Sequence, residues 1–139
     1  MSEIVIRDFN MMTDGNFVFS SWIKSFYGKS PTSLFVPEWE YKDKQSKLIA
    51  KLLELSTTKV AVNASDANVL VAYAVFQKEI NTLHYVYVKE LFRGFGICRK
   101  LLLEAAAQRG TRVTHLTMRG KTMSERRGYI YSPYFDLKS

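Results

Sequence analysis

The residues best suited to chemistry lie in one short segment, where a run of apolar residues gives way to a basic loop containing two glycines. The run Tyr85–Val88 is followed by Arg93, Gly94 and Gly96, and a helical pattern begins at the second glycine. Glycine lets a backbone approach a ligand closely, and the first N–H groups of a helix have no partner inside it. With the positive end of the helix dipole, such a junction binds anions. The segment therefore predicts a site for a phosphate-bearing ligand.

Two familiar phosphate-binding loops do not fit this junction. A P-loop needs a Gly-Lys pair followed by Ser or Thr, and none follows this run. A dinucleotide-binding fingerprint that began at Gly94 and Gly96 would need a third glycine at position 99, where Arg99 stands.

The segment instead resembles motif A of the GCN5-related N-acetyltransferases. In that motif an Arg or Gln, two residues, a Gly, one residue and a Gly or Ala lie between the fourth strand and the third helix. Residues 93–98 read Arg-Gly-Phe-Gly-Ile-Cys here, and Tyr-Val-Tyr-Val precedes them at 85–88. The resemblance covers about residues 3–130. Within the family, the chain most resembles the small, compact members that tailed bacteriophages encode.

The resemblance implies that the loop amides hold the diphosphate of acetyl-coenzyme A, the cosubstrate of that family. The backbone of the preceding strand would pair with the pantetheine arm, a role that falls to Val86 and Val88. Cys98 replaces the usual small residue, and its thiol is only slightly larger than a methyl group. The positions that match the family's diphosphate loop are Arg93, Gly94, Phe95, Gly96, Cys98 and Arg99.

The catalytic groups common in the family do not all have counterparts. Thr82 stands near the usual glutamate of the fourth strand, and Ser124 stands where a tyrosine acid is expected. His84 shares a strand face with Thr82 and has a default pKa near neutrality, so it is the first candidate base. His115 is predicted on the neighbouring parallel strand, and Tyr131 is a candidate acid. Two hydrogen-bonded structural histidines are about as well supported as two catalytic ones.

The hydrophobic pattern predicts the elements that position these residues. Meander strands followed by a strand–helix–strand crossover require a mixed sheet. The predicted fold is therefore α/β, with a mostly antiparallel sheet, helices on both faces and a parallel crossover through Gly96–Gln108, in a single domain over residues 1–139. The predicted strands are Ile4–Phe9, Lys59–Asn63, Val69–Lys78, Thr82–Val88 and Val113–Met118, and Tyr129–Phe135 is predicted as a short strand or an extended tail. The predicted helices are one capped by Thr13 or Asp14 and running to Phe26, Glu38–Leu55 with Trp39 on its buried side, Gly96–Gln108, and one or two turns over Lys121–Arg127.

The positive charge is confined to one part of the chain. The net charge is +7, and the residues before Lys89 carry equal numbers of acidic and basic side chains. All of the excess therefore lies between Lys89 and Arg127. A localised excess indicates a polyanionic partner, so coenzyme A or a nucleic acid fits this segment.

Composition limits the remaining classes. No apolar run approaches the ~18–20 residues of a membrane span, and the first residues do not read as a signal peptide. A single cysteine, Cys98, excludes an internal disulfide, and two histidines 31 positions apart have no metal-ligand spacing. We expect a cytoplasmic protein (in the bacterial host cytoplasm if a phage encodes it) with no bound metal, and a sheet edge open to homodimer formation.

Three functions remain open on these grounds. The leading one is acetyl-coenzyme-A-dependent N-acetyl transfer to an amine of a small molecule or a protein. The second is a phage protein that has the same fold and acts on nucleic acid. It would be either a DNA-modifying enzyme similar to Mom or a DNA-binding module, and the basic segment 89–127 is the feature that supports it. The third is a phage component that keeps the fold without turnover.

Overall fold

A six-stranded mixed sheet forms the centre of the protein. The computed structural model describes residues 3–30 and 33–134. The strands follow one another across the sheet in chain order; the first four pair antiparallel, and the last two continue in parallel. They are β1 (Ile4–Asp8), β2 (Thr57–Asn63), β3 (Asp66–Gln77), β4 (Thr82–Val88), β5 (Arg112–Val113) and β6 (Ile130–Tyr131). The predicted mixed α/β fold is confirmed.

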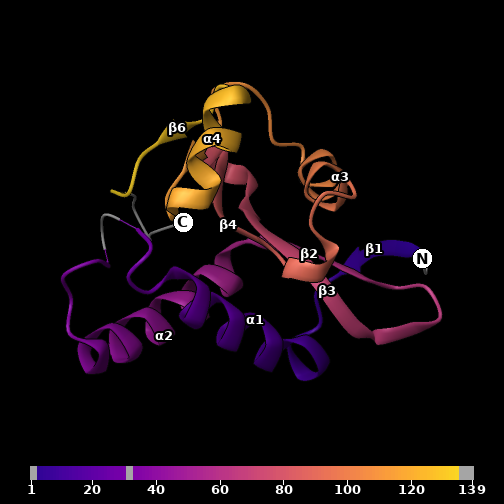
Figure 1. Cartoon of the computed structure of the whole chain (residues 1–139), viewed down its shortest axis with the longest axis horizontal. Coiled ribbons are helices and arrows are strands. Elements are labelled where there is room, and N and C mark those ends of the chain that lie inside the picture. Colours follow the sequence, from indigo (N-terminus) through magenta and orange to yellow (C-terminus); the bar gives the residue numbers. More distant parts are fainter. Residues whose placement is uncertain (1–2, 31–32, 135–139) are drawn as a thin grey trace.

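Helices cover both faces of this sheet. In Figure 1 the indigo and magenta helices lie together on one side of the sheet, and the orange and yellow helices lie on the other. The first pair packs on the alternate residues of the sheet that include Tyr73 and Tyr85, and the second pair packs on those that include Ala72 and Leu83. The first pair is α1 (Met11–Phe26) and α2 (Glu38–Leu55), the second is α3 (Ile97–Glu104) and α4 (Met118–Arg126), and short 3-10 turns occupy Lys78–Ile80 and Glu90–Phe92.

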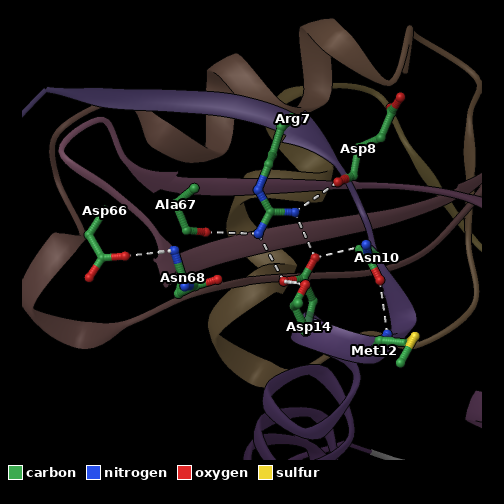
Figure 2. Close-up of polar contacts among 9 residues, drawn as sticks. Arg7, Asp8, Asn10, Met12, Asp14, Asp66, Ala67 and Asn68 are labelled. Atoms are coloured by element: carbon green, nitrogen blue, oxygen red, sulfur yellow. Dashed lines mark hydrogen bonds and ion pairs between the residues drawn. The ribbon is translucent and has the colours of Figure 1, made fainter.

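The start of α1 is fixed by a cap other than the predicted one and by a buried ion pair. Asn10, and not Thr13 or Asp14, caps the helix, because its side chain accepts from the Met12 N–H. The Asp14 carboxylate is fully buried and receives two bonds from the Arg7 guanidinium, at 2.7 and 2.9 Å (Figure 2). Burial alone would raise the pKa of Asp14, but the bonds from Arg7, the Asn10 N–H and Thr13 outweigh it and lower that pKa.

We expect Arg7→Ala to destabilise the fold by about 3 kcal/mol, because it leaves the buried Asp14 carboxylate without its cation. The same change removes the Arg7 bond to the Ala67 carbonyl, which links β1 to the start of β3. Lys47→Met is the matched control: its pair with Asp43 is exposed, so its loss should cost less than about 0.5 kcal/mol. Urea unfolding measures both changes, and equal effects would contradict this role of Arg7.

The strand β5 is much shorter than predicted. It pairs with β4 only through Thr82–Arg112 and Leu83–Val113, and a last bond runs from the Thr114 N–H to the Leu83 carbonyl. The prediction of a strand over Val113–Met118 is therefore wrong. Beyond this point the chain leaves the sheet, and Thr117 caps α4 by accepting from the Gly120 N–H.

Two further expectations about helices are corrected. The third helix ends at Glu104 instead of Gln108, because Ala106 has a left-handed backbone with φ of +64°. Trp39 was expected in the core but is 74% exposed. It lies two residues, or about 200°, from the buried stripe of α2 that contains Tyr41 and Ile49.

Among the described residues, no helix is long and apolar enough to cross a membrane.

Candidate functional site

A gap opens between β4 and β5 where their pairing stops. On its other side β4 continues to pair with β3, and the Lys89 N–H bonds to the Val71 carbonyl. Antiparallel strands bond at alternate residue pairs, so the N–H and C=O groups of Val86 and Val88 point away from β3, into the gap. The Val88 carbonyl accepts a bond from Arg93 Nε at 2.9 Å, which agrees with this direction. The Val86 groups and the Val88 N–H therefore form an edge of β4 with which an extended ligand can pair.

A bulge in β4 sets the point at which the strands separate. Val75 pairs with Tyr85 while the next residue, Phe76, pairs with Leu83, so His84 is an extra residue in the strand. A bulge bends a strand and increases its twist. The end of β4 therefore turns away from β5.

The glycine loop lies at the end of this free edge. Gly94 and Gly96 have φ of +86° and +79°, a backbone that L side chains rarely adopt, and an added Cβ at either would meet nothing within 4 Å. Gly96 precedes α3 and offers no side-chain cap, so the first N–H groups of that helix have no partner within it. Arg93 adds a full positive charge. The loop has the open backbone and the charge that an anionic group needs.

One cleft joins the loop, the free strand edge and both layers of helices. Its volume is about 1280 Å³. On the α3 side it is lined by Val86, Val88, Arg93, Gly94, Gly96, Ile97, Cys98 and Met123. On the α1 side it is lined by Asn16, Phe17, Ser20, Ser21, Lys24, Ser25, Gly28, Lys29, Tyr85 and Tyr87, with Thr117, Met118, Arg119 and Gly120 across the gap. The cleft thus extends past β4 to residues from the helices on both faces of the sheet.

Six of the eight predicted cofactor positions line this cleft, namely Val86, Val88, Arg93, Gly94, Gly96 and Cys98. The other two, Phe95 and Arg99, do not line it. Phe95 is 55% exposed, and Arg99 is exposed in the first turn of α3. Burial raises the pKa of the Cys98 thiol, with a smaller opposing effect of Arg127, so the thiol stays protonated and is a poor nucleophile.

The two histidines meet, but outside the cleft lining. His84 Nδ1 and His115 Nδ1 each lie 2.8 Å from the Thr114 hydroxyl, and His84 Nε2 lies 2.9 Å from Gln77 Oε1. Both rings are buried, and burial lowers the pKa of His84 to about 4 and that of His115 to about 3. Because β5 ends at Val113, His115 lies beyond the strand on which it was predicted. This network ties the β4 bulge to the end of β5.

The position of Tyr131 also differs from the expected one. Tyr131 pairs with Val113 in the sheet and does not line the cleft. Its assignment as the acid stays a prediction. Ser124, at the usual position of the family's acid, is buried on α4 and likewise does not line the cleft.

The sequence reasoning missed the polar face of α1. Every fourth residue from position 16 and from position 17 lines the cleft, which gives two adjacent rows on one helix face. These rows are Asn16, Ser20 and Lys24, and Phe17, Ser21 and Ser25. Two hydroxyls of this face bond to the sheet: Ser25 to Tyr85 at 2.6 Å and Ser21 to Tyr73 at 3.0 Å. The sequence sign of this polar face was a row of small polar residues on a helix whose other face is apolar.

Cationic side chains outnumber acidic ones in the cleft. Glu90 is the one carboxylate among the described lining residues, and it lies just after β4. Within residues 3–30 and 33–134, no group of three or more His, Cys, Asp or Glu side chains is placed to hold a metal ion.

Comparison with known proteins finds likeness in structure alone. No family model matches the sequence, and no curated protein is significantly similar to it. A solved structure described as a possible acetyltransferase from Clostridium difficile 630 superimposes with a TM-score of 0.58 at 15% identity, covering 98% of this chain and 95% of that one. YjaB from Escherichia coli, in its apo form, gives a TM-score of 0.53 at 20% identity over 74% of this chain.

A third similar structure is a region described as a GCN5-related glucosamine N-acetyltransferase within a fungal multidomain β-N-acetylglucosaminidase. It gives a TM-score of 0.54 at 18% identity over 77% of this chain. The chain spans 12% of the length of that fungal protein and 64% of YjaB. Likeness at these identities is likeness of fold: the chain has the fold of the GCN5-related N-acetyltransferases.

Proposed function

We propose that the chain is an acetyl-coenzyme-A-dependent N-acetyltransferase that acts on the amine of a small molecule or a protein. The observation that carries the proposal is the continuity, in one cleft, of the free β4 edge with the glycine loop at the start of α3. The open backbone at Gly94 and Gly96 fits a diphosphate, and the extended edge at Val86 and Val88 fits a pantetheine arm.

Acetyl-coenzyme A would supply an acetyl thioester. As the amine nitrogen bonds to the acetyl carbon, the carbon–sulfur bond breaks, the amine loses a proton and the thiolate takes one up. A thiol pKa near 8.5 makes the thiolate a fair leaving group, so a strong acid is not required. The amine must attack as the neutral base, and no histidine or aspartate lines the cleft among the described residues.

The charge of the cleft lowers the need for a base. Lys24, Lys29 and Arg119 line the side that would receive the amine. A nearby positive charge disfavours the ammonium form, so the pKa of a bound amine falls and more of it is neutral. We assign His84 and His115 a positioning role, because their network with Thr114 holds β4 and β5 together where the cleft begins.

Calorimetric titration with acetyl-coenzyme A, followed by detection of free thiol with a panel of amines, tests the proposal. We expect saturable binding at one site and thiol release that depends on an added amine. Gel shifts with duplex DNA at two salt concentrations test the alternative of nucleic-acid binding, which should weaken steeply as salt rises. Absence of acetyl-coenzyme A binding would overturn the proposal; binding without transfer to any amine would favour a protein that keeps the fold without turnover.

A further inference from the structure

The half of the cleft that faces α1 is cationic, and no acidic side chain is among its described lining residues. Its charged members are Lys24 on α1, Lys29 just after that helix and Arg119 in the first turn of α4. None of the three forms an ion pair with a carboxylate within residues 3–30 and 33–134. Three cations on three segments therefore line the same cleft.

The fold brings these segments together. The Met118 N–H donates to the Lys29 carbonyl at 3.0 Å, which fixes the start of α4 against the end of α1. Lys24 lies in the same row of α1 as Ser20. The Lys29 N–H in turn bonds to the Phe26 carbonyl, so the turn that carries Lys29 is anchored to the helix. Backbone bonds thus hold together the segments that carry these cations.

The rest of this half supplies neutral hydrogen-bonding groups. Ser20, Ser21 and Ser25 present hydroxyls, and Tyr85 adds a phenol whose pKa is raised by burial to about 12, so it stays neutral. Hydroxyls donate to and accept from polar ligands but do not balance a positive charge. Glu90, the one carboxylate among the described lining residues, lies at the far end, beside the glycine loop.

The glycine loop does not need these cations. Arg93 and the N–H groups at the start of α3 would serve the diphosphate there. Lys24 and Lys29 belong to the α1 layer on the opposite face of the sheet, and Arg119 lies where the start of α4 meets that layer. A polycationic acceptor, such as a polyamine or a lysine-rich peptide, would be repelled by Lys24, Lys29 and Arg119. An acceptor that carries its own negative charge would be attracted by them.

We propose that the acceptor is a small amine that also carries an anionic group, a carboxylate or a phosphate, and that Lys24, Lys29 and Arg119 bind this group. The inference rests on the proposed acetyl transfer and names its substrate class. The amine is acetylated while the anionic group stays unchanged, so the product is an N-acetyl derivative with the same anion.

Matched pairs of amines test the inference by calorimetric titration into the protein saturated with coenzyme A. One pair is O-phosphoethanolamine with ethanolamine, and the other is 4-aminobutanoate with butylamine; spermidine serves as the polycation. We expect the anionic member of at least one pair to bind at least tenfold more tightly than its neutral twin, with a difference that shrinks as salt rises. The phosphate and carboxylate pairs also distinguish the two kinds of anion.

Variants locate the binding of the anion. Lys24→Met combined with Lys29→Met should reduce the preference for the anionic twin at least tenfold. Lys44→Met removes one exposed lysine from α2, outside the cleft, and should leave that preference unchanged. Equal binding of the twins, tighter binding of spermidine, or no binding of any amine overturns the acceptor assignment alone. Failure of coenzyme A itself to bind overturns the proposed function.

Discussion

Gly96→Val is expected to weaken acetyl-coenzyme A binding at least 100-fold. Gly96 has φ of +79°, where a β-branched residue is strained, so the loop must change its path at the start of α3. The N–H groups that would bind the diphosphate then point elsewhere. A hydrogen bond to a charged group is worth about 1.5–3 kcal/mol, so the loss of two such bonds accounts for a change of this size.

Gly110→Val is the matched control for this variant. Gly110 has φ of +92°, an added Cβ there also meets nothing within 4 Å, and the residue lies outside the cleft. The control therefore carries the same kind of backbone strain without touching the loop, and it should bind acetyl-coenzyme A as the unchanged protein does. Calorimetry measures both affinities, and thermal unfolding verifies that both variants are folded. Unchanged affinity in Gly96→Val would remove the glycine loop from the cofactor site.

The junction at residues 85–98 could be predicted because its signal is local. The alternation of Thr82–Val88, the two glycines and the onset of a helical pattern all lie within a few residues of one another. The structure confirms the strand with the same bounds, and the longest helix, Glu38–Leu55, is also confirmed with its bounds. Periodicity over many residues and glycine positions at turns do not depend on distant contacts.

The histidine network could not be predicted with the same certainty. A period of two places His84 on the same strand face as Thr82 and Val86, which would aim it at the thioester. The bulge at His84 breaks this alternation, and the His84 ring bonds instead to Thr114, just after β5, and to Gln77, at the end of β3. The ring is buried as a result. Local alternation cannot report a register shift that distant partners stabilise.

The side of the cleft that α1 lines could not be predicted for a related reason. The first helix carries enough apolar residues for a core face, and Trp22 and Phe26 are indeed buried there. The adjacent row of Ser21 and Ser25 would be expected to face solvent, but the divergence of β5 from β4 places it along a cleft. A polar row becomes a site only when another element, here the start of α4, closes over it.

Acid is expected to destabilise this protein steeply between pH 6.5 and pH 4. Burial lowers the pKa of His84 to about 4 and of His115 to about 3, whereas both titrate near 6.5 in the unfolded chain. In this range the unfolded state binds protons that the folded state does not, so stability is complete above pH 6.5 and falls as pH falls. Each histidine contributes a slope of up to about 1.4 kcal/mol per pH unit. Asp14, whose pKa is lowered, loses its contribution only at lower pH.

His115→Phe separates this effect from general acid sensitivity. Phenylalanine keeps the aromatic contacts with Trp22 and Phe26, while His84 keeps its own bond to Thr114. The variant should therefore take up one proton fewer on unfolding, and the slope of stability between pH 6.5 and 4 should fall to about half. Urea unfolding at half-unit pH steps measures the slope, and NMR titration of the two imidazoles measures each pKa directly. An unchanged slope would contradict the buried network. So would an imidazole that titrates near pH 6.5 in the folded protein, because a ring that takes up a proton near neutral pH cannot be the neutral link between β4 and β5.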